Sequence, residues 1–157
     1  MPPPATSNGS FTRSNFSALI CIDSRELRAQ AGEQLAELGL EIHTANTVEE
    51  AVTELYSHLY DIVVTTEDFC GGDAEIHPIL AELASLTLDL RRSMFVVLIG
   101  ANRVTRSAMD AFSLSVDLVV HQEDTSSLKA LVGHGLARQE KFYEAFRAEA
   151  KLIQREG

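Results

Sequence analysis

Four acidic side chains are the residues best placed to do chemistry. They are Asp23, Glu67, Asp68 and Asp73. Each follows an apolar run of the kind that forms a buried strand, and carboxylate oxygens are the ligands that Mg²⁺ prefers, so together they could hold a cation weakly. The simpler interpretation, which we favour, is a helix cap followed by solvated loop acids, because clustered like charges repel one another without a counterion.

The other reactive residue types form no metal or phosphate motif. His43, His58, His77 and His134 are scattered without an i, i+4 histidine pair. Gly71-Gly72 has no Lys-Ser/Thr after it, as a phosphate-binding loop requires. Cys21 lies in an apolar run and is predicted to be a core residue, whereas Cys70 is predicted to be an exposed thiol without an assigned role. No metal and no cofactor are therefore predicted.

Composition places the chain among ordinary globular domains and limits its partners. It has 157 residues, of which 45% are hydrophobic and 23% charged, enough for one domain with a sizeable core. The net charge of −10 disfavours nucleic acid and anionic membranes, both of which would repel the protein. The first residues lack the features of a signal peptide, and two unpatterned cysteines fit a reducing compartment, so a cytoplasmic protein is expected.

Short apolar runs alternate with longer amphipathic stretches, which is typical of a parallel sheet wrapped by helices. Strands are expected at 18–22, 41–45, 61–66, 94–100 and 117–121. Helices are expected at about 24–38, 48–58, 74–85 and 104–114, and from about 125 onward with interruptions at Gly133 and Gly135. Asp23-Ser24 and the capping box formed by Thr47 and Glu50 mark the first two helix starts. The inward residues of the third helix are predicted to be Ile76, Ile79, Leu80 and Leu83.

Several phrases within these elements resemble the response-regulator receiver family over about residues 17–135. The phrases are Asp23-Ser24-Arg25-Glu26-Leu27-Arg28, Leu38-Gly39-Leu40-Glu41-Ile42, Ala45-Asn46, Glu49-Glu50-Ala51, Tyr60-Asp61-Ile62-Val63-Val64 and Val116-Asp117-Leu118-Val119-Val120. Each phrase is weak alone, but their order and spacing make a specific signal. The resemblance implies a doubly wound, flavodoxin-like α/β fold with strand order 2-1-3-4-5, and a role in two-component signal transduction.

The chain departs from the receiver pattern at the positions that carry the family's chemistry. The resemblance puts the phosphoacceptor carboxylate at Thr66, and a hydroxyl without a base is a far poorer nucleophile. It puts the Mg²⁺-binding acids at Ile22 and Asp23, the hydroxyl at Gly100 and the lysine at His121. Four of the five positions are altered, so the sequence indicates a degenerate pseudo-receiver that is not an enzyme.

Two more specific interpretations of the residues at the carboxyl ends of the strands remain open. Asp68 lies two residues beyond Thr66, so it could act as a displaced acceptor, although the supporting partners are missing too. His121 could make a pH-dependent contact near the altered lysine position. A polar residue that simply ends a strand is the more common role, and we favour it.

The C-terminal segment extends beyond the receiver pattern. We divide the chain into a disordered tail at 1–15, which has too little apolar content to fold, a pseudo-receiver domain at 16–136, and an amphipathic helix at 137–157. Phe142, Tyr143, Phe146 and Ile153 continue an apolar stripe for which the sheet has no room left. We expect the stripe to bind a protein partner or a second copy in a homodimer, the alternative being that it folds back on its own domain.

The sequence therefore favours a phosphorylation-independent interaction module, an adaptor or regulatory subunit in a bacterial signalling or motility assembly. The alternative is a small-molecule or nucleotide sensor that uses the crevice at the carboxyl ends of the strands, where such sheets bind ligands. Its predicted lining is Thr65, Thr66, Gly100, Asn102 and His121.

Overall fold

Five parallel strands form a single sheet in the order β2-β1-β3-β4-β5, as predicted. The computed structural model describes residues 16–73 and 76–139. The strands are β1 (Ser17–Cys21), β2 (Glu41–Thr44), β3 (Ile62–Thr66), β4 (Phe95–Gly100) and β5 (Leu118–His121). β3 and β4 are buried along their whole length because helices cover both faces of the sheet, which explains their continuous apolar sequence.

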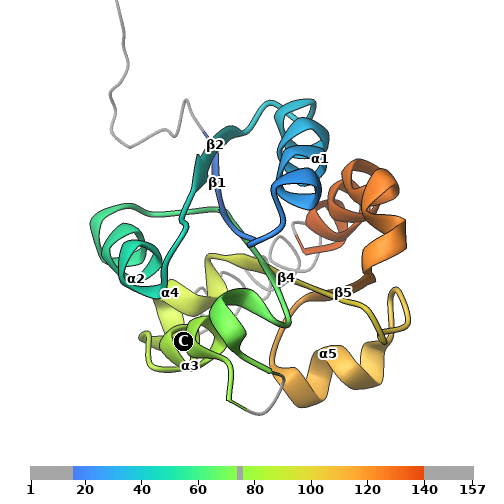
Figure 1. Cartoon of the computed structure of the whole chain (residues 1–157). Helices are drawn as coiled ribbons and strands as arrows, with labels where there is room; N and C mark the ends of the chain where they lie inside the picture. Colours follow the sequence, from blue (N-terminus) through green and yellow to red (C-terminus); the bar gives the residue numbers. More distant parts are fainter. Residues whose placement is uncertain (1–15, 74–75, 140–157) are drawn as a thin grey trace, which may run out of the picture.

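Helices lie on both faces of the sheet (Figure 1). They are α1 (Arg25–Ala36), α2 (Val48–Ser57), α3 (Pro78–Ala84), α4 (Leu88–Arg92) and α5 (Ala108–Leu114), with short 3₁₀ turns η2 (Phe69–Gly71) and η3 (Gln122–Ser127). Residues 128–139 are also helical and lie beside α1. The two predicted caps are present: the Ser24 hydroxyl accepts from Leu27 N at 3.2 Å, and the Thr47 hydroxyl accepts from Glu50 N at 3.1 Å.

Successive strand residues point to opposite faces, so each strand contributes to two separate cores. Ile20 and Ile22 belong to the core beneath α1 and residues 128–139, together with Leu128 and Val132. Leu19 and Cys21 belong to the other core. That second core also contains Ala51 and Leu55 of α2, Ile79 and Leu83 of α3, and Tyr60, Phe69 and Val119. The period-two alternation therefore divides the apolar surface between the two helical layers.

Two aspartates hold the start of neighbouring strands together. Asp61 donates its N–H to Ser17 O at 2.9 Å, and its carboxylate accepts from Ser17 N at 2.8 Å. Asp117 makes the same reciprocal pair with Val96, at 2.9 and 2.8 Å. Both residues stand in phrases that carry the receiver resemblance. These phrases therefore help to align neighbouring strands at the amino-terminal edge of the sheet.

The structure corrects several predicted helices. The third helix begins at Pro78, so Ile76 is 79% exposed instead of inward, while Ile79 and Leu83 are buried as predicted. The connection before β4 contains a helix, α4, that was not predicted because it buries no residue and so shows no periodicity. α5 begins at Ala108 instead of about Val104.

The predicted interruptions at Gly133 and Gly135 are also wrong, because the helix passes through both. Cys21 is buried and Cys70 exposed, as predicted. The predicted tail at 1–15 and residues 140–157 of the predicted C-terminal helix, including all four partner-binding residues, lie outside the described residues. No helix within 16–73 and 76–139 has the length and apolar content needed to cross a membrane.

Candidate functional site

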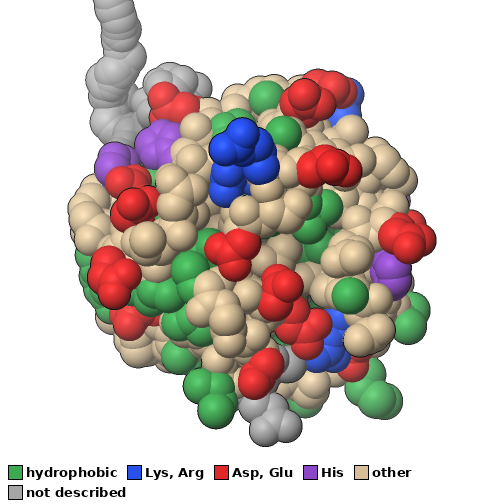
Figure 2. Space-filling model, viewed as in Figure 1, with side chains coloured by type: hydrophobic (Ala, Val, Ile, Leu, Met, Phe, Trp, Pro, Cys, Tyr) green, Lys and Arg blue, Asp and Glu red, His purple; other side chains and the backbone are tan. Residues whose placement is uncertain are grey.

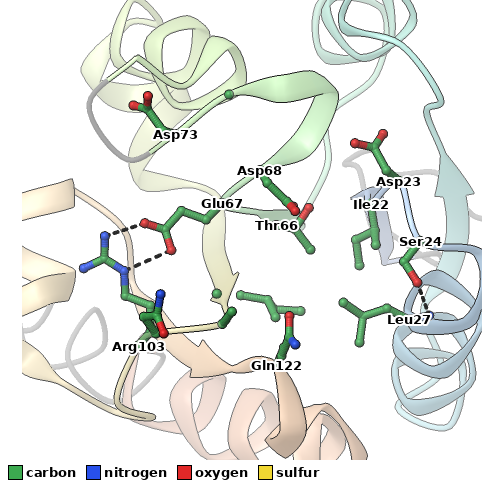
Figure 3. Close-up of a pocket in the computed structure, with 15 residues that line it drawn as sticks. Ile22, Asp23, Ser24, Leu27, Thr66, Glu67, Asp68, Asp73, Arg103 and Gln122 are labelled. Atoms are coloured by element: carbon green, nitrogen blue, oxygen red, sulfur yellow. Dashed lines mark hydrogen bonds and ion pairs between the residues drawn. The ribbon is translucent and has the colours of Figure 1, made fainter.

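A pocket of about 580 Å³ lies at the carboxyl edge of the sheet, over the ends of β1, β3 and β4 (Figure 3). Its lining includes Ile22 and Asp23 after β1, Thr66, Glu67, Asp68 and Asp73 at and after β3, Gly100, Asn102 and Arg103 at and after β4, and Gln122 of η3. Parallel strands bring their carboxyl ends to the same edge, so residues that are far apart in the sequence meet there.

Four of the five positions that the resemblance assigns to receiver chemistry line this pocket: Ile22, Asp23, Thr66 and Gly100. The fifth, His121, pairs with Gly100 in the sheet but is not part of the lining. Its Nδ1 accepts from Glu123 N at 3.0 Å and caps η3. This contact supports the interpretation of His121 as a polar residue that ends a strand. Of the lining predicted for a sensor, Thr66, Gly100 and Asn102 are present, whereas Thr65 and His121 are not.

Thr66 lies at the position where the resemblance puts the acceptor carboxylate. It is the last residue of β3, it is 6% exposed, and its hydroxyl has no hydrogen-bond partner within residues 16–73 and 76–139. None of these described residues therefore serves as a base that takes the hydroxyl proton and makes the oxygen a nucleophile. The buried, unpaired hydroxyl costs stability unless something else satisfies it.

A buried histidine that the sequence analysis did not single out supports the end of β3. His77 Nδ1 accepts from Ile79 N at 3.1 Å and from Leu80 N at 3.3 Å, which caps α3. Nε2 therefore carries the proton, and it donates to the Thr66 carbonyl at 2.8 Å. The His77-Pro78 pair before an apolar run was the available sequence signal, because proline favours the first helical position.

An ion pair occupies the place where the resemblance puts a hydroxyl side chain. Arg103 Nη2 donates to Glu67 Oε2 at 2.6 Å, and Nε donates to Oε1 at 3.2 Å (Figure 3). A Cβ atom at Gly100 would overlap Glu67 Oε1 and lie 2.8 Å from Arg103 Cγ. The hydrogen bond that Arg103 donates to Glu67 raises the pKa of Arg103 still further, and Asp110 Oδ2 lies 3.4 Å from Arg103 Nη1. The absence of a side chain at Gly100 thus leaves room for this pair.

Three of the four acids at the pocket, Asp23, Glu67 and Asp73, are engaged in ways that support the helix-cap and loop interpretation. The Asp23 carboxylate accepts from Cys70 N at 2.8 Å, and Asp73 accepts from Ile76 N at 2.8 Å. Glu67 is paired with Arg103. Partial burial and the nearby Asp23 carboxylate raise the pKa of the Cys70 thiol, so it stays protonated and is a weak nucleophile.

Within residues 16–73 and 76–139, one group of three His, Cys, Asp or Glu side chains is close enough to share a metal ion. It consists of His43, Glu54 and His58 and lies outside this pocket.

Comparison with known proteins gives fold likeness alone. No protein-family model matches the chain, and no curated protein matches its sequence. A CheY-like receiver domain protein from Methanospirillum hungatei aligns with a TM-score of 0.63 at 15% identity, covering 82% of this chain and 98% of that one. A Francisella response-regulator receiver domain aligns with a TM-score of 0.61 at 17% identity, covering 79% and 98%.

The receiver domain described for a LuxO repressor from Vibrio parahaemolyticus aligns with a TM-score of 0.64 at 13% identity, covering 83% and 97%. Together with the strand order, these likenesses establish that the chain has the fold of response-regulator receiver domains.

Proposed function

We propose that this chain is a receiver-like protein interaction module that works without phosphorylation and without catalysis. It would serve as an adaptor or regulatory subunit in a signalling or motility assembly. The receiver fold supports the signalling part. The single observation that carries the rest is Thr66, a buried hydroxyl with no hydrogen-bond partner at the position where a receiver needs a carboxylate.

The surroundings of Thr66 support the same conclusion. Ile22 is fully buried at a position where Mg²⁺ binding would require an acid, and Asp23 is already hydrogen-bonded to the backbone of Cys70. The Glu67–Arg103 pair fills the space beside Gly100, where a hydroxyl would respond to a phosphoryl group. Among the described residues, Ile22 does not supply the second acid that metal-assisted phosphoryl transfer would need. Gly100 does not supply the hydroxyl that would respond to a bound phosphoryl group.

Incubation with phosphoramidate and Mg²⁺ should therefore leave the mass of the intact chain unchanged. The measurement is intact-mass spectrometry, with a receiver domain that retains its acceptor aspartate as the positive control. A phosphoryl gain that disappears in Asp68→Asn would establish the displaced acceptor and contradict the proposal. A gain that disappears in Thr66→Val would make Thr66 the acceptor, with the same consequence.

An exposed apolar surface on α5 is suited to protein contact. Met109 and Phe112 are 82% and 87% exposed and lie three residues apart, on the same face of the helix. Gln139, the last described residue, lines the same pocket as Phe112. The described part of the C-terminal helical stretch therefore ends beside α5, and the sequence after Gln139 carries Phe142 and Phe146. We propose that these apolar groups form one contact with a second copy of the chain.

Light scattering on the full chain should give the mass of a dimer. Phe142→Glu combined with Phe146→Glu should give a monomer, because two buried charges would have no partners. Leu59→Glu is the control, since Leu59 is 64% exposed but follows α2 and lies outside this surface. A monomeric wild type at matched concentration, or a monomer produced equally by Leu59→Glu, would contradict the homodimer.

The second candidate function is a sensor of small polar molecules, favoured by a pocket of about 580 Å³ whose lining includes Thr66, the residue with the unpaired hydroxyl. Anionic ligands such as nucleotides are disfavoured, because Asp23, Asp68 and Asp73 surround the opening and Arg103 is already paired. Saturable thermal stabilisation by a neutral polyol or amide, lost in Thr66→Val, would support it.

A further inference from the structure

Two histidines and a glutamate meet at the outer edge of the sheet, away from the pocket described above. His43 lies on the edge strand β2, Glu54 in the last turn of α2, and His58 directly after that helix. In Figure 2, histidine and acidic side chains gather at the upper left of the surface, over β2 and α2. The sequence signal was weak, because His43 and His58 are far apart in the sequence and only Glu54 and His58 have the i, i+4 spacing.

The spacing of their ligand atoms matches a metal coordination sphere. Glu54 Oε1 lies 3.3 Å from His58 Nδ1 and 3.6 Å from His43 Nδ1, and one ligand atom from each residue falls within 4.8 Å of the others. Two ligands held by Zn²⁺ at about 2.0–2.1 Å in tetrahedral geometry are about 3.3–3.4 Å apart. Only small side-chain movements would therefore bring the three groups onto one ion.

Neighbouring groups would orient these ligands. His43 Nδ1 lies 2.8 Å from the Tyr60 hydroxyl, and an ion bound there would replace this contact. Glu41 Oε1 lies 3.2 Å from His43 Nε2, so Nε2–H could donate to the Glu41 carboxylate while Nδ1 binds the ion. The Tyr60 hydroxyl donates to Glu54 Oε1 at 2.5 Å, which holds that carboxylate toward the histidines. A carboxylate behind a ligating histidine is the usual outer partner in protein zinc sites, where it fixes the tautomer and the ring orientation.

We propose that His43, Glu54 and His58 bind a divalent transition-metal ion of the Zn²⁺ type, with water or a partner's side chain as the fourth ligand. Imidazole and carboxylate together suit Zn²⁺ better than Mg²⁺ or Ca²⁺, which prefer oxygen ligands only. The side chains are 27%, 32% and 49% exposed, so an ion can reach them from solvent. The strand and helix that carry the ligands are fixed by buried neighbours, including Leu55 of α2.

The test is calorimetric titration of the full chain with Zn²⁺, together with the visible absorption spectrum of the Co²⁺-loaded protein. Wild type should bind one ion. His58→Gln and Glu54→Gln should each weaken binding at least about ten-fold, since loss of even an outer partner costs about 10–100-fold. His134→Gln is the matched control, an exposed histidine outside the cluster that should leave the affinity unchanged.

Three results would overturn the proposal. The first is that wild type does not bind Zn²⁺, in which case the cluster is a hydrogen-bonded network without an ion. The second is that His134→Gln weakens binding as much as His58→Gln. The third is a thiolate-to-cobalt charge-transfer band lost in Cys70→Ser, which would place the ion on the exposed thiol. Circular dichroism of each variant confirms that a loss of binding is not a loss of fold.

Discussion

Replacing Gly135 by alanine should destabilise the domain by about 1 kcal/mol, whereas the same change at Gly133 should stabilise it by about 0.5–1 kcal/mol. Both glycines lie inside the helical residues 128–139, where alanine is normally favoured. A Cβ at Gly133 would make an ordinary contact of 3.7 Å with Leu38. A Cβ at Gly135 would overlap the tip of the Phe95 ring and lie 2.9 Å from its Cε1 atom.

The expected destabilisation by Gly135→Ala follows from comparing two free energies, the cost of overpacking and the gain in helix propensity. Overpacking a core costs about 1–3 kcal/mol, and the gain in helix propensity returns only about 0.5–1 kcal/mol. Phe95 is 4% exposed in β4, so its ring has little freedom to move aside. Urea unfolding followed by circular dichroism measures both variants. In a Phe95→Leu background the cost of Gly135→Ala should vanish, and a shift of the same sign at both glycines would contradict the packing argument.

Thr66→Val should raise the free energy of unfolding by about 1 kcal/mol, and Thr65→Val should lower it by a similar amount. The two residues are adjacent in β3 and both buried, but their hydroxyls differ. Thr66 Oγ1 has no partner, so valine removes an unsatisfied polar group at nearly constant volume. Thr65 Oγ1 donates to the Thr66 carbonyl at 3.2 Å and lies 3.4 Å from His77 Nε2.

Chemical denaturation of the two variants in the same buffer is the measurement, and each variant serves as the control for the other. Destabilisation by Thr66→Val would mean that the hydroxyl is hydrogen-bonded in solution, which contradicts its isolation. The variant also separates the two candidate functions. An interaction module should keep its assembly when Thr66 is valine, whereas a sensor that uses the hydroxyl should lose its ligand response.

The two candidate surfaces lie on different parts of the fold, which makes their effects separable. The proposed apolar contact would use α5 together with Phe142 and Phe146, and the proposed metal cluster would use β2 and the end of α2. Zn²⁺ binding should therefore be unchanged in Phe142→Glu with Phe146→Glu, unless the partner copy supplies the fourth ligand. In that case the loss of the dimer would weaken metal binding as well.

Local patterns were sufficient to predict the layers of the fold. Buried parallel strands must be apolar on both faces, so runs such as 95–100 are visible without any structure. The caps at Ser24 and Thr47 depend on residues three positions away and were predicted for the same reason. The assignment of the acceptor position to Thr66 comes from the resemblance and stays a prediction, whereas the placement of Thr66 at the end of β3 is confirmed.

Only the tertiary structure decided which distant side chains meet. Glu67 and Arg103 are separated by 36 residues, and their pairing depends on the paths of two loops and on the missing side chain at Gly100. The meeting of His43 with His58, and of Gly135 with Phe95, likewise depends on how a helix packs on the sheet. Periodicity determines which face of an element is buried, but the neighbour across that face is set by packing in three dimensions.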